Sequence, residues 1–214
     1  MTTIVGRNCK IEVALTFDSA ISPTAVTKAT SGVATLTSHT VDTGDVGYWT
    51  ATSGMVELDG QAVYCTDTDA NTFTLNGLDT TNYSTFTAGP TLTLAATWGL
   101  LDEAGGYAVG GGAAATLDDS RLHLNKVRNI AGLNAAEDLT INIKTPEIEG
   151  SALAFLTRAA RNGSNVLIKI TKGSQVLRVA YGVPSVYGEQ VDVGSLGTGS
   201  FSIICPALVV KPNV

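Results

Sequence analysis

The sequence predicts a mainly β protein with one α-helix packed on its sheet and a small all-β module inserted near the N-terminus. Apolar and polar residues alternate in several short segments, which is the pattern of half-buried strands. Apolar residues recur at helical spacing only in residues 145–163. Threonine is concentrated in residues 20–97, which contain 20 Thr among 78 positions. We therefore expect a main domain of residues 1–19 and 98–214 and an inserted module of residues 20–97.

The first predicted strand runs from Cys9 to Phe17, where apolar residues occupy the odd positions. We expect the module to interrupt the chain after this strand, and the strand pattern to resume near Trp98. Within the module, short strand-like segments are separated by turn signals such as DTGD at Asp42–Asp45. The module holds one cation, Lys28, and seven anions, so it accounts for the whole net charge of −6. We expect this acidic module on the outer surface of an assembly, where its charge keeps finished assemblies apart.

The remaining elements follow in order after the module. Residues 104–134 form a long segment with no clear strand in its first half, and loops of this length are usually functional. Strands are predicted at residues 139–145, 166–172, 176–182 and 200–205, with a hairpin turn at Lys172–Ser174.

The one predicted helix follows the first of these four strands. Thr145 can cap its first turn, Pro146 suits its first position, and Gly163 is a natural terminator. Its apolar stripe predicts that the helix packs on the sheet.

Composition narrows the class of protein. Charged residues make up 15% of the chain, against about 25% in a typical soluble domain, which favours surfaces covered by partners. The acidic balance argues against tight binding of nucleic acid, because phosphate contacts need clustered Lys and Arg. We see no export signal, and glycine and proline interrupt the apolar run Val193–Val210, so we expect no membrane binding. Cys9, Cys65 and Cys205 are too scattered for a disulfide framework, and we expect reduced, mostly packed thiols.

Candidate catalytic groups are few. Only His39 and His123 could act as the base of a nucleophilic triad, and we interpret both as solvated or interface residues. The adjacent carboxylates Asp118 and Asp119 would face opposite sides of a strand and could not share a proton. We therefore predict that the protein is not an enzyme. A hydrolase, the competing hypothesis, would lose its activity on replacement of either histidine by alanine.

Two cofactor-like patterns are incomplete. Asp67–Asn71 matches the start of a calcium loop, but the glycine position of that loop holds Thr72, so we interpret the segment as an acidic turn. Gly110–Ala115 resembles a dinucleotide-binding glycine pattern, but no βαβ unit surrounds it. We predict no cofactor and no metal.

Several segments resemble the tail tube proteins, the major tail proteins of bacteriophages with long non-contractile tails. The segments are KIEVALTFD (10–18), TLDDSRLHLNKVRNIAGL (116–133), LTINIKT (139–145), EIEGSALAFLTRAARNG (147–163), NVLIKITKG (165–173), QVLRVAYGVPSVYGE (175–189) and GTGSFSIICPALVV (197–210). With these segments the resemblance covers about two-thirds of the chain. The module is similar to a small β module found within phage structural proteins.

The resemblance implies a tail-tube β-sandwich or barrel with the helix on its outside. Six copies would form a ring, and stacked rings would form a hollow tube whose inner barrel conducts DNA without binding it specifically. The other implied partners are the tail tape measure, tail tip and terminator proteins. The implied location is the virion tail, after synthesis in the host cytoplasm.

Contacts between rings or subunits are expected in the long segment, which mixes apolar and charged side chains. The candidates are Tyr107, Leu117, Asp118, Asp119, Arg121, Leu122, Leu124, Val127, Arg128, Ile130 and Leu133. Shortening residues 105–119 is expected to spare folding and block stacking, whereas deleting residues 23–94 is expected to leave tube assembly intact.

Charge in the bore is an open question. The family tends to have an acidic bore, whereas the predicted strands carry Lys10, Glu12, Lys144, Lys169 and Arg178. If all five faced the bore, it would be basic and would bind DNA. Either some of them face elsewhere, or the loop acids Asp102, Glu103, Asp118 and Asp119 offset them.

A second hypothesis is a carbohydrate-binding or adhesin-like β module on a virion or cell surface. It is suggested by the aromatic residues of the module, Tyr48, Trp49, Tyr64, Tyr83 and Phe86. The same side chains would serve as the core of a module of this size, which needs large apolar groups to fold.

Overall fold

The computed structural model describes residues 9–110, 114–118, 129–134, 137–144, 150–185, 188–190, 197–206 and 209–212. The first half of the chain forms β1 (Cys9–Phe17), β2 (Ala25–Val26), β3 (Val33–Thr35), β4 (Val46–Thr50), the short 3-10 helix η1 (Val56–Leu58), β5 (Ala62–Asp69), β6 (Thr72–Asn76) and β7 (Thr91–Leu100). The second half forms β8 (Ala104–Gly110), β9 (Ala114–Asp118), β10 (Asn129–Asn134), β11 (Asp138–Lys144), α1 (Ser151–Asn162), β12 (Val166–Lys172), β13 (Gln175–Pro184), β14 (Gly188–Gln190) and β15 (Thr198–Ile204).

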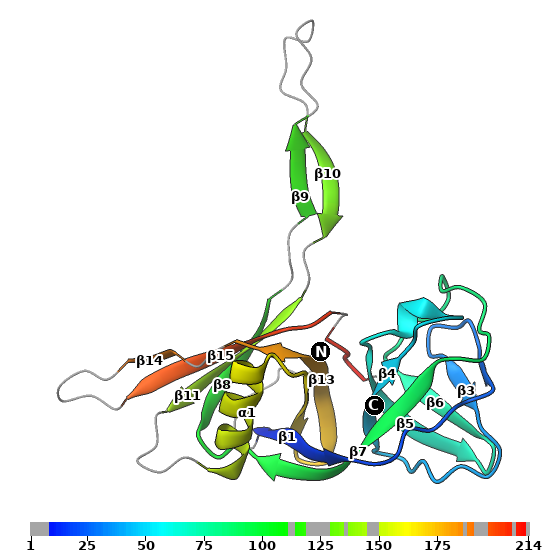
Figure 1. Ribbon diagram of the computed structural model, residues 1–214, viewed down its shortest axis with the longest axis horizontal. Coiled ribbons are helices and arrows are strands. Elements are labelled where there is room, and N and C mark those ends of the chain that lie inside the picture. Colours follow the sequence, from blue (N-terminus) through cyan, green and yellow to red (C-terminus); the bar gives the residue numbers. More distant parts are fainter. Residues whose placement is uncertain are drawn as a thin grey trace, which may run out of the picture.

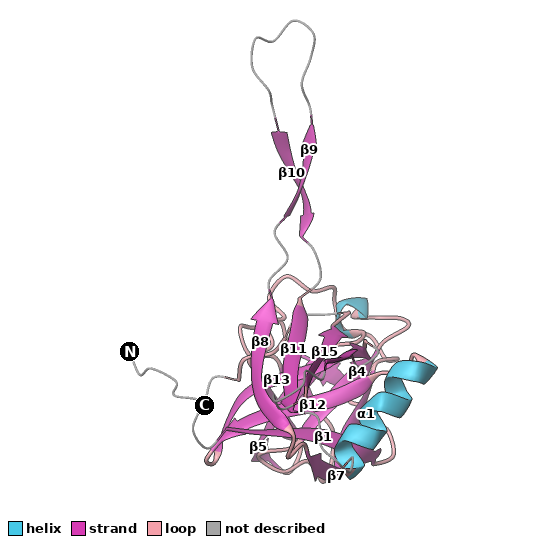
Figure 2. Ribbon diagram, turned by 90° about the vertical axis from the view of Figure 1, so that its left-hand side faces the viewer, coloured by secondary structure: helices cyan, strands magenta, loops and turns pink. Residues whose placement is uncertain are grey.

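These elements make a mainly β protein built on one curled, antiparallel half-barrel sheet with one α-helix (Figure 1). Twelve strands follow one path, β2-β3-β6-β5-β4-β7-β1-β12-β13-β15-β11-β8, and β14 pairs beside β15. Strands β9 and β10 form a separate two-stranded sheet, which stands away from the rest in both views (Figures 1 and 2).

The strands and the hairpin predicted in the C-terminal half are confirmed. β12 has the predicted bounds, and β11, β13 and β15 agree with their predictions to within two residues. Lys172 pairs with Gln175 across the turn, where Gly173 adopts a positive φ of 61°. Glycine accepts this conformation without steric cost, which is why the local sequence located the hairpin.

The helix is confirmed at its C-terminal end. Gly163 has left-handed geometry with φ 64°, and its N–H bonds to the carbonyls of the last turn. The helix begins at Ser151, and its N-cap is Gly150. Glycine has no side chain, so the N-cap gives the first turn no side-chain hydrogen bond. The predicted cap, Thr145, and Pro146 lie outside the described residues.

The expectation that residues 104–110 lack a strand is wrong. They form β8, which pairs antiparallel with β11 so that Tyr107 lies opposite Ile141 and Gly110 opposite Asp138. Glycine and alanine have low strand propensity, but propensity in a sheet depends mostly on the neighbouring strand. A fully formed partner, β11, therefore extends the sheet over a segment whose own composition is typical of a loop.

One strand joins the module to the main domain. β7 pairs with β4 along residues 91–94 and with β1 along residues 95–100, so it crosses the expected boundary at Trp98 without a break. One apolar core lies between the main sheet and α1, and another lies inside the module. A third lies between the module and the face of β12 and β13 opposite the helix, where the rings of Tyr48 and Tyr181 stack 4.2 Å apart.

Gly182 is required where β13 passes from β12 to β15. It pairs with Val166, while the next residue, Val183, pairs with Ile204. A Cβ at position 182 would lie 2.8 Å from the carbonyl carbon of Ile204 and 3.0 Å from the Cα of Cys205, and such backbone atoms cannot swing aside.

We therefore expect Gly182→Ala to lower the free energy of unfolding by about 3 kcal/mol, the upper range for overpacking. Urea denaturation measures this change. Gly106→Ala is the matched control, because no heavy atom lies within 4 Å of its added Cβ, and its effect should stay within about 0.5 kcal/mol. Equal stability of the two variants would contradict the assignment.

Candidate assembly surfaces

Four strands form a wing of the sheet, which we define as β14-β15-β11-β8. β11 lies at its centre, paired with β15 on one side and β8 on the other. Among the described strands, β8 pairs only with β11 and β14 pairs only with β15. The wing extends past α1 (Figure 1). A strand with a single neighbour can pair with a strand of another chain.

The two faces of the wing differ in chemistry. On the core face, Leu139, Ile141 and Phe201 are fully buried in the core that includes α1. The other face, which we call the outer face of the wing, carries the alternate residues, such as Asn142 opposite Ser200. At the end of this face nearest the module, Ile204 is 60% exposed.

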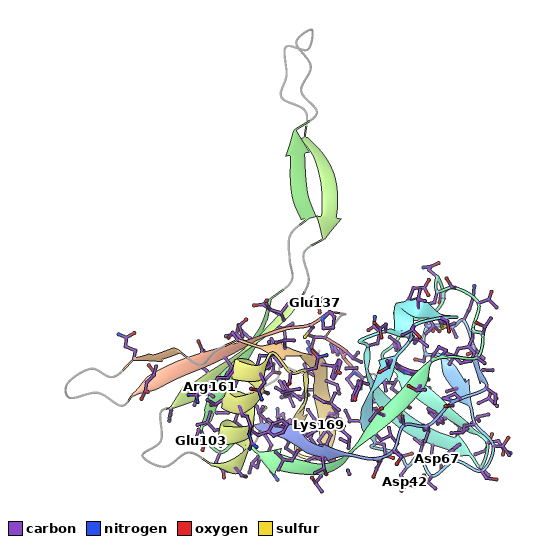
Figure 3. All side chains as sticks on the ribbon, viewed as in Figure 1. Asp42, Asp67, Glu103, Glu137, Arg161 and Lys169 are labelled. Atoms are coloured by element: carbon purple, nitrogen blue, oxygen red, sulfur yellow. The ribbon has the colours of Figure 1, made fainter. Side chains whose placement is uncertain are left out.

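Glu103 fixes α1 relative to the wing. It lies in the short turn between β7 and β8, and its Oε1 accepts a hydrogen bond of 2.8 Å from the backbone N–H of Gly150. A carboxylate at a helix N-terminus is favourable because of the helix dipole, and Arg161 lies in the last turn at the opposite end (Figure 3). The backbone carbonyl of Glu103 also accepts a bond from Lys144. This carboxylate therefore holds the start of the helix, a role that the sequence did not suggest for Glu103.

The predicted contact residues divide among three places. Tyr107 lies in β8 and packs partly against the main core. Leu117 and Ile130 are opposite each other in the β9–β10 hairpin, Asp118 lies opposite Asn129, and Leu133 lies in β10. Asp119, Arg121, Leu122, Leu124, Val127 and Arg128, together with His123, lie outside the described residues. Of the predicted contact residues, Leu117 and Ile130 are thus directly cross-strand neighbours in the hairpin.

The glycine-rich pattern at Gly110–Ala115 begins at the end of one strand and ends within the next strand. Gly110 ends β8 and Ala115 lies in β9. A dinucleotide site needs a helix N-terminus directly after its glycines, which β9 does not provide.

The structure shows on which face of the sheet the charged strand residues lie, a point that the sequence alone did not determine. Lys169 Nζ lies 3.5 Å from Glu12 Oε2 and 4.1 Å from the ring centre of Trp98. Lys169 lies on the same face of β12 as Leu167, the face that packs against the module. Arg178 lies opposite Ile170 and donates a hydrogen bond to the carbonyl of Leu177.

Lys10 is on β1 opposite Thr171. Of the five charged strand residues, only Lys144 therefore lies on the outer face of the wing, where it pairs with Thr198.

The interpretation of His39 as solvated or interfacial is wrong. Its side chain is 1% exposed and its ring packs edge-on against Phe73. Nδ1 accepts a hydrogen bond from the N–H of Val41, and Nε2 lies 3.9 Å from Asp67 Oδ1. Sequence could not show this burial, because the packing partners of His39 come from a distant strand of the module.

The acidic segment near Asp69 forms a turn, as predicted. Asp69 accepts hydrogen bonds from the N–H of Asn71 and the hydroxyl of Thr72, and these bonds hold the pKa of its carboxyl below the ordinary value. Among the residues that the structure describes, no group of three or more His, Cys, Asp or Glu side chains could hold a metal ion.

The cysteines are free thiols. Cys65 and Cys205 are buried, and Cys9 is partly exposed, which confirms the prediction of mostly packed thiols. Burial raises the pKa of Cys205 to about 11 and that of Cys65 above its ordinary value. The thiolate is the reactive form, so both groups are poor nucleophiles at neutral pH.

The module aromatics pack inward. Trp49 is 1% exposed in the module core, Tyr64 is 6% exposed in the core between module and main domain, and Tyr83 and Phe86 pack against the module core. Tyr48 stacks on Tyr181. The observation that suggested a carbohydrate-binding module is thus accounted for by packing.

A cleft of about 580 Å³ lies where the module meets the main domain, with Tyr181, Val183 and Ile204 among its lining residues.

Within the described ranges, no helix is both long enough and apolar enough to cross a membrane. No protein-family model matches the chain, and no curated protein matches its sequence.

Proposed function

We propose that the protein is the structural subunit of a bacteriophage tail tube, in which six copies form a ring and stacked rings form a conduit for DNA. The observation that carries this proposal is the wing, a four-stranded sheet whose outermost strands, β8 and β14, each pair with one neighbour among the described strands. The number of copies and the role in DNA passage come from the family resemblance of the sequence.

The two edges of the wing favour a ring over a dimer. β8 on one copy and β14 on the next are different strands, so their contact is head-to-tail, which excludes a two-fold dimer and gives a ring where the rotation between copies closes. Ring closure pairs every edge and removes the exposed backbone groups that would otherwise cause aggregation. The low charge content of 15% fits a surface that is largely covered after assembly.

The remaining parts have separate roles in the tube. α1 and the acidic module lie outside the barrel formed by the wings. The β9–β10 hairpin, which forms its own small sheet, contacts the next ring. The subunit performs no catalysis, and assembly follows from its repeating, self-complementary surfaces.

A charge on the β8 edge tests the proposal. Val109 is 37% exposed on β8, so Val109→Lys should barely change folding, within about 0.5 kcal/mol, while placing a cation at the ring contact. We expect rings and tubes, counted by negative-stain electron microscopy, to fall at least about tenfold, as a loss of 1.4 kcal/mol would produce. Val56→Lys is the matched control, because Val56 is 49% exposed on η1 in the module, and this variant should assemble normally.

Two results would contradict the proposal. One is unchanged ring formation by Val109→Lys. The other is a wild-type protein that stays monomeric over several salt concentrations and with a tail initiator complex present.

A further inference from the structure

We infer that the exposed C-terminal half of α1 binds the acidic tip of the module of a second copy of this chain. The first surface, the basic end of α1, carries Arg158 and Arg161. The acidic tip consists of the turns Asp42–Asp45 and Asp67–Asn71. The inference goes beyond the proposed function, because it adds a contact between copies outside the wing and gives the charge of the module an attractive role.

The basic end of α1 is uncovered. Arg158, Arg161 and Asn162 are exposed, whereas Leu153 and Leu156 on the other side of the helix are fully buried in the main core. The helix contains no acidic residue that could offset its arginines. Within the described part of the chain, neither arginine has an ion-pair partner. This end of the helix therefore presents two cations toward solvent.

A hollow of about 240 Å³ lies beside these cations, with Phe155, Arg158, Asn162 and Ser164 among its lining residues. It combines a partly exposed aromatic ring with a guanidinium group and polar side chains. The planar fork of arginine N–H groups matches the two oxygens of a carboxylate. The hollow therefore fits a small acidic loop.

The end of the helix leaves little negative charge to repel such a loop. The carbonyl of Ala159 accepts a hydrogen bond from the N–H of Ser164, and the N–H of Gly163 bonds to the carbonyl of Ala160. Carbonyls that are paired in this way form the usual closed end of a helix. The guanidinium groups extend beyond them on long side chains, where a carboxylate meets the cations first.

The acidic tip is held in shape before any contact forms. Its two turns are joined by a hydrogen bond of 3.0 Å from the N–H of Asp67 to Thr43 Oγ1. Within the first turn, the N–H of Asp42 donates to Asp45 Oδ2 over 2.8 Å. A loop that is already ordered loses little conformational freedom on binding, so more of the attraction appears as affinity.

Like charges are crowded at the acidic tip. Asp42 and Asp67 are exposed (Figure 3), and the side chain of Asp67 is 48% exposed. Burial, and then the carboxylates of Asp42 and Asp18, raise the pKa of Asp45. Lys169 offsets this effect only in part, because it is already paired within the main domain. Cations from another molecule would relieve the repulsion.

One copy does not bring its own two surfaces together. α1 and the module pack against opposite faces of β12 and β13. Figure 3 shows Asp42 and Asp67 well apart from Arg161. The contact therefore joins two copies through different surfaces, so it is head-to-tail, like the proposed contact between wing edges. Both surfaces also lie outside the proposed barrel, where they remain available after the wings have paired.

The contact should depend on salt. An exposed ion pair contributes little by itself, but in an assembly the same contact repeats for every copy. Salt screens exposed charges over about 10 Å at 0.1 M ionic strength. We therefore expect the contact to be measurable at low salt and to weaken as salt rises.

An exchange of charges tests the contact. Arg158→Glu with Arg161→Glu reverses the basic end of α1, and Asp42→Lys with Asp67→Lys reverses the acidic tip. At low salt, we expect each pair to raise the protein concentration for half self-association at least about tenfold, equivalent to 1.4 kcal/mol. The chain with all four substitutions should return to within about threefold of wild type, because opposite charges again face each other. Sedimentation velocity measures the association.

Net charge is controlled in two ways. Lys10→Glu with Lys211→Glu changes the net charge as much as the arginine reversal, at exposed positions elsewhere, and should associate like wild type. Reversal of the acidic tip reduces the magnitude of the net charge of −6, which by itself would favour association. Weaker association of that variant would therefore report the loss of a specific contact. Urea denaturation checks that each variant is folded.

A cross-link tests the contact without any reversal of charge. In a Cys9→Ser background both remaining native thiols are buried. Ala70→Cys in the acidic tip and Asn162→Cys on α1 are placed in separate chains, mixed at low salt and oxidised. We expect a disulfide-linked heterodimer. Thr30→Cys, exposed in the turn between β2 and β3, is the matched control for Ala70→Cys and should give at least about tenfold less heterodimer.

The outcomes separate this inference from the proposed function. Heterodimer no greater than in the Thr30→Cys control would overturn the inference, as would a four-substitution chain no better than its parents. Tubes in normal yield from both charge-reversed proteins would also overturn it and leave the tube standing. Association that is restored by the charge exchange, in a wild-type protein that forms no tubes, would support this contact and overturn the proposed function.

Discussion

Replacing residues 19–94 with an Asn-Gly turn is expected to destabilise the main domain, although the chain can be rejoined without strain. Phe17 pairs with Ala95, so a short turn closes β1 onto the second half of β7. The deletion removes the cover over Leu167 and Val179, each fully buried in the core between module and main domain. Loss of this burial lowers the free energy of unfolding by roughly 3–6 kcal/mol, at about 1.5–3 kcal/mol for each side chain.

This expected loss argues against the sequence-based expectation that deleting residues 23–94 leaves tube assembly intact. A domain of ordinary stability has about 5–15 kcal/mol in total, so the truncated protein would be marginal and would expose a new apolar patch. Urea denaturation and size-exclusion chromatography measure the two effects. Adding Leu167→Thr and Val179→Thr should restore solubility but not stability. A truncated chain as stable and monodisperse as the full protein would contradict this account.

Replacing residues 111–136 with Asn-Gly should leave rings intact and abolish stacking. Gly110 and Asp138 are paired at the base of the hairpin, so a short turn that keeps Glu137 reconnects β8 to β11. Glu137 is retained because its Oε2 accepts a hydrogen bond from the N–H of Val209. With the hairpin removed, the proposed contact between rings is lost while the edges of the wing remain.

Electron microscopy of the hairpin deletion should show single rings in place of tubes, and its urea midpoint should match that of the full chain. The shortening of residues 105–119 suggested by the sequence is the informative contrast. It removes most of β8, including Tyr107, which packs on the main core, so it should prevent ring formation as well. Tubes of normal length from the hairpin deletion would exclude the stacking role.

Local signals explain which elements could be predicted. β12, β13 and the turn at Gly173 were predictable because strand alternation and a positive-φ glycine are readable within a few residues. The end of α1 at Gly163 follows the same logic. β8 was missed because its glycine-rich sequence has no strand signal of its own, and it forms a strand through its pairing with β11.

The candidate surfaces were predicted only in part for a related reason. Sequence indicated that residues 104–134 matter for contacts and that the strands carry several cations. It did not show that Lys169 is paired with Glu12 beside Trp98, or that Lys144 and Asp138 lie at opposite ends of β11 on the outer face of the wing. Alternation separates two faces of one strand but does not say which neighbour covers each face.

The sequence by itself determined that the protein is mainly β with one α-helix, and it showed the separate composition of the module and the location of its acidic charge. It did not predict that module and main domain share one curled half-barrel sheet. Only the tertiary structure decided that β7 joins the module to the main sheet, that Tyr48 stacks on Tyr181, and that Asn142, Thr198 and Ser200 are exposed on one face of the wing. The physical reason is that periodicity, turns and caps act over a few residues. Strand pairing and the burial of one face against another depend on contacts between residues far apart in the chain.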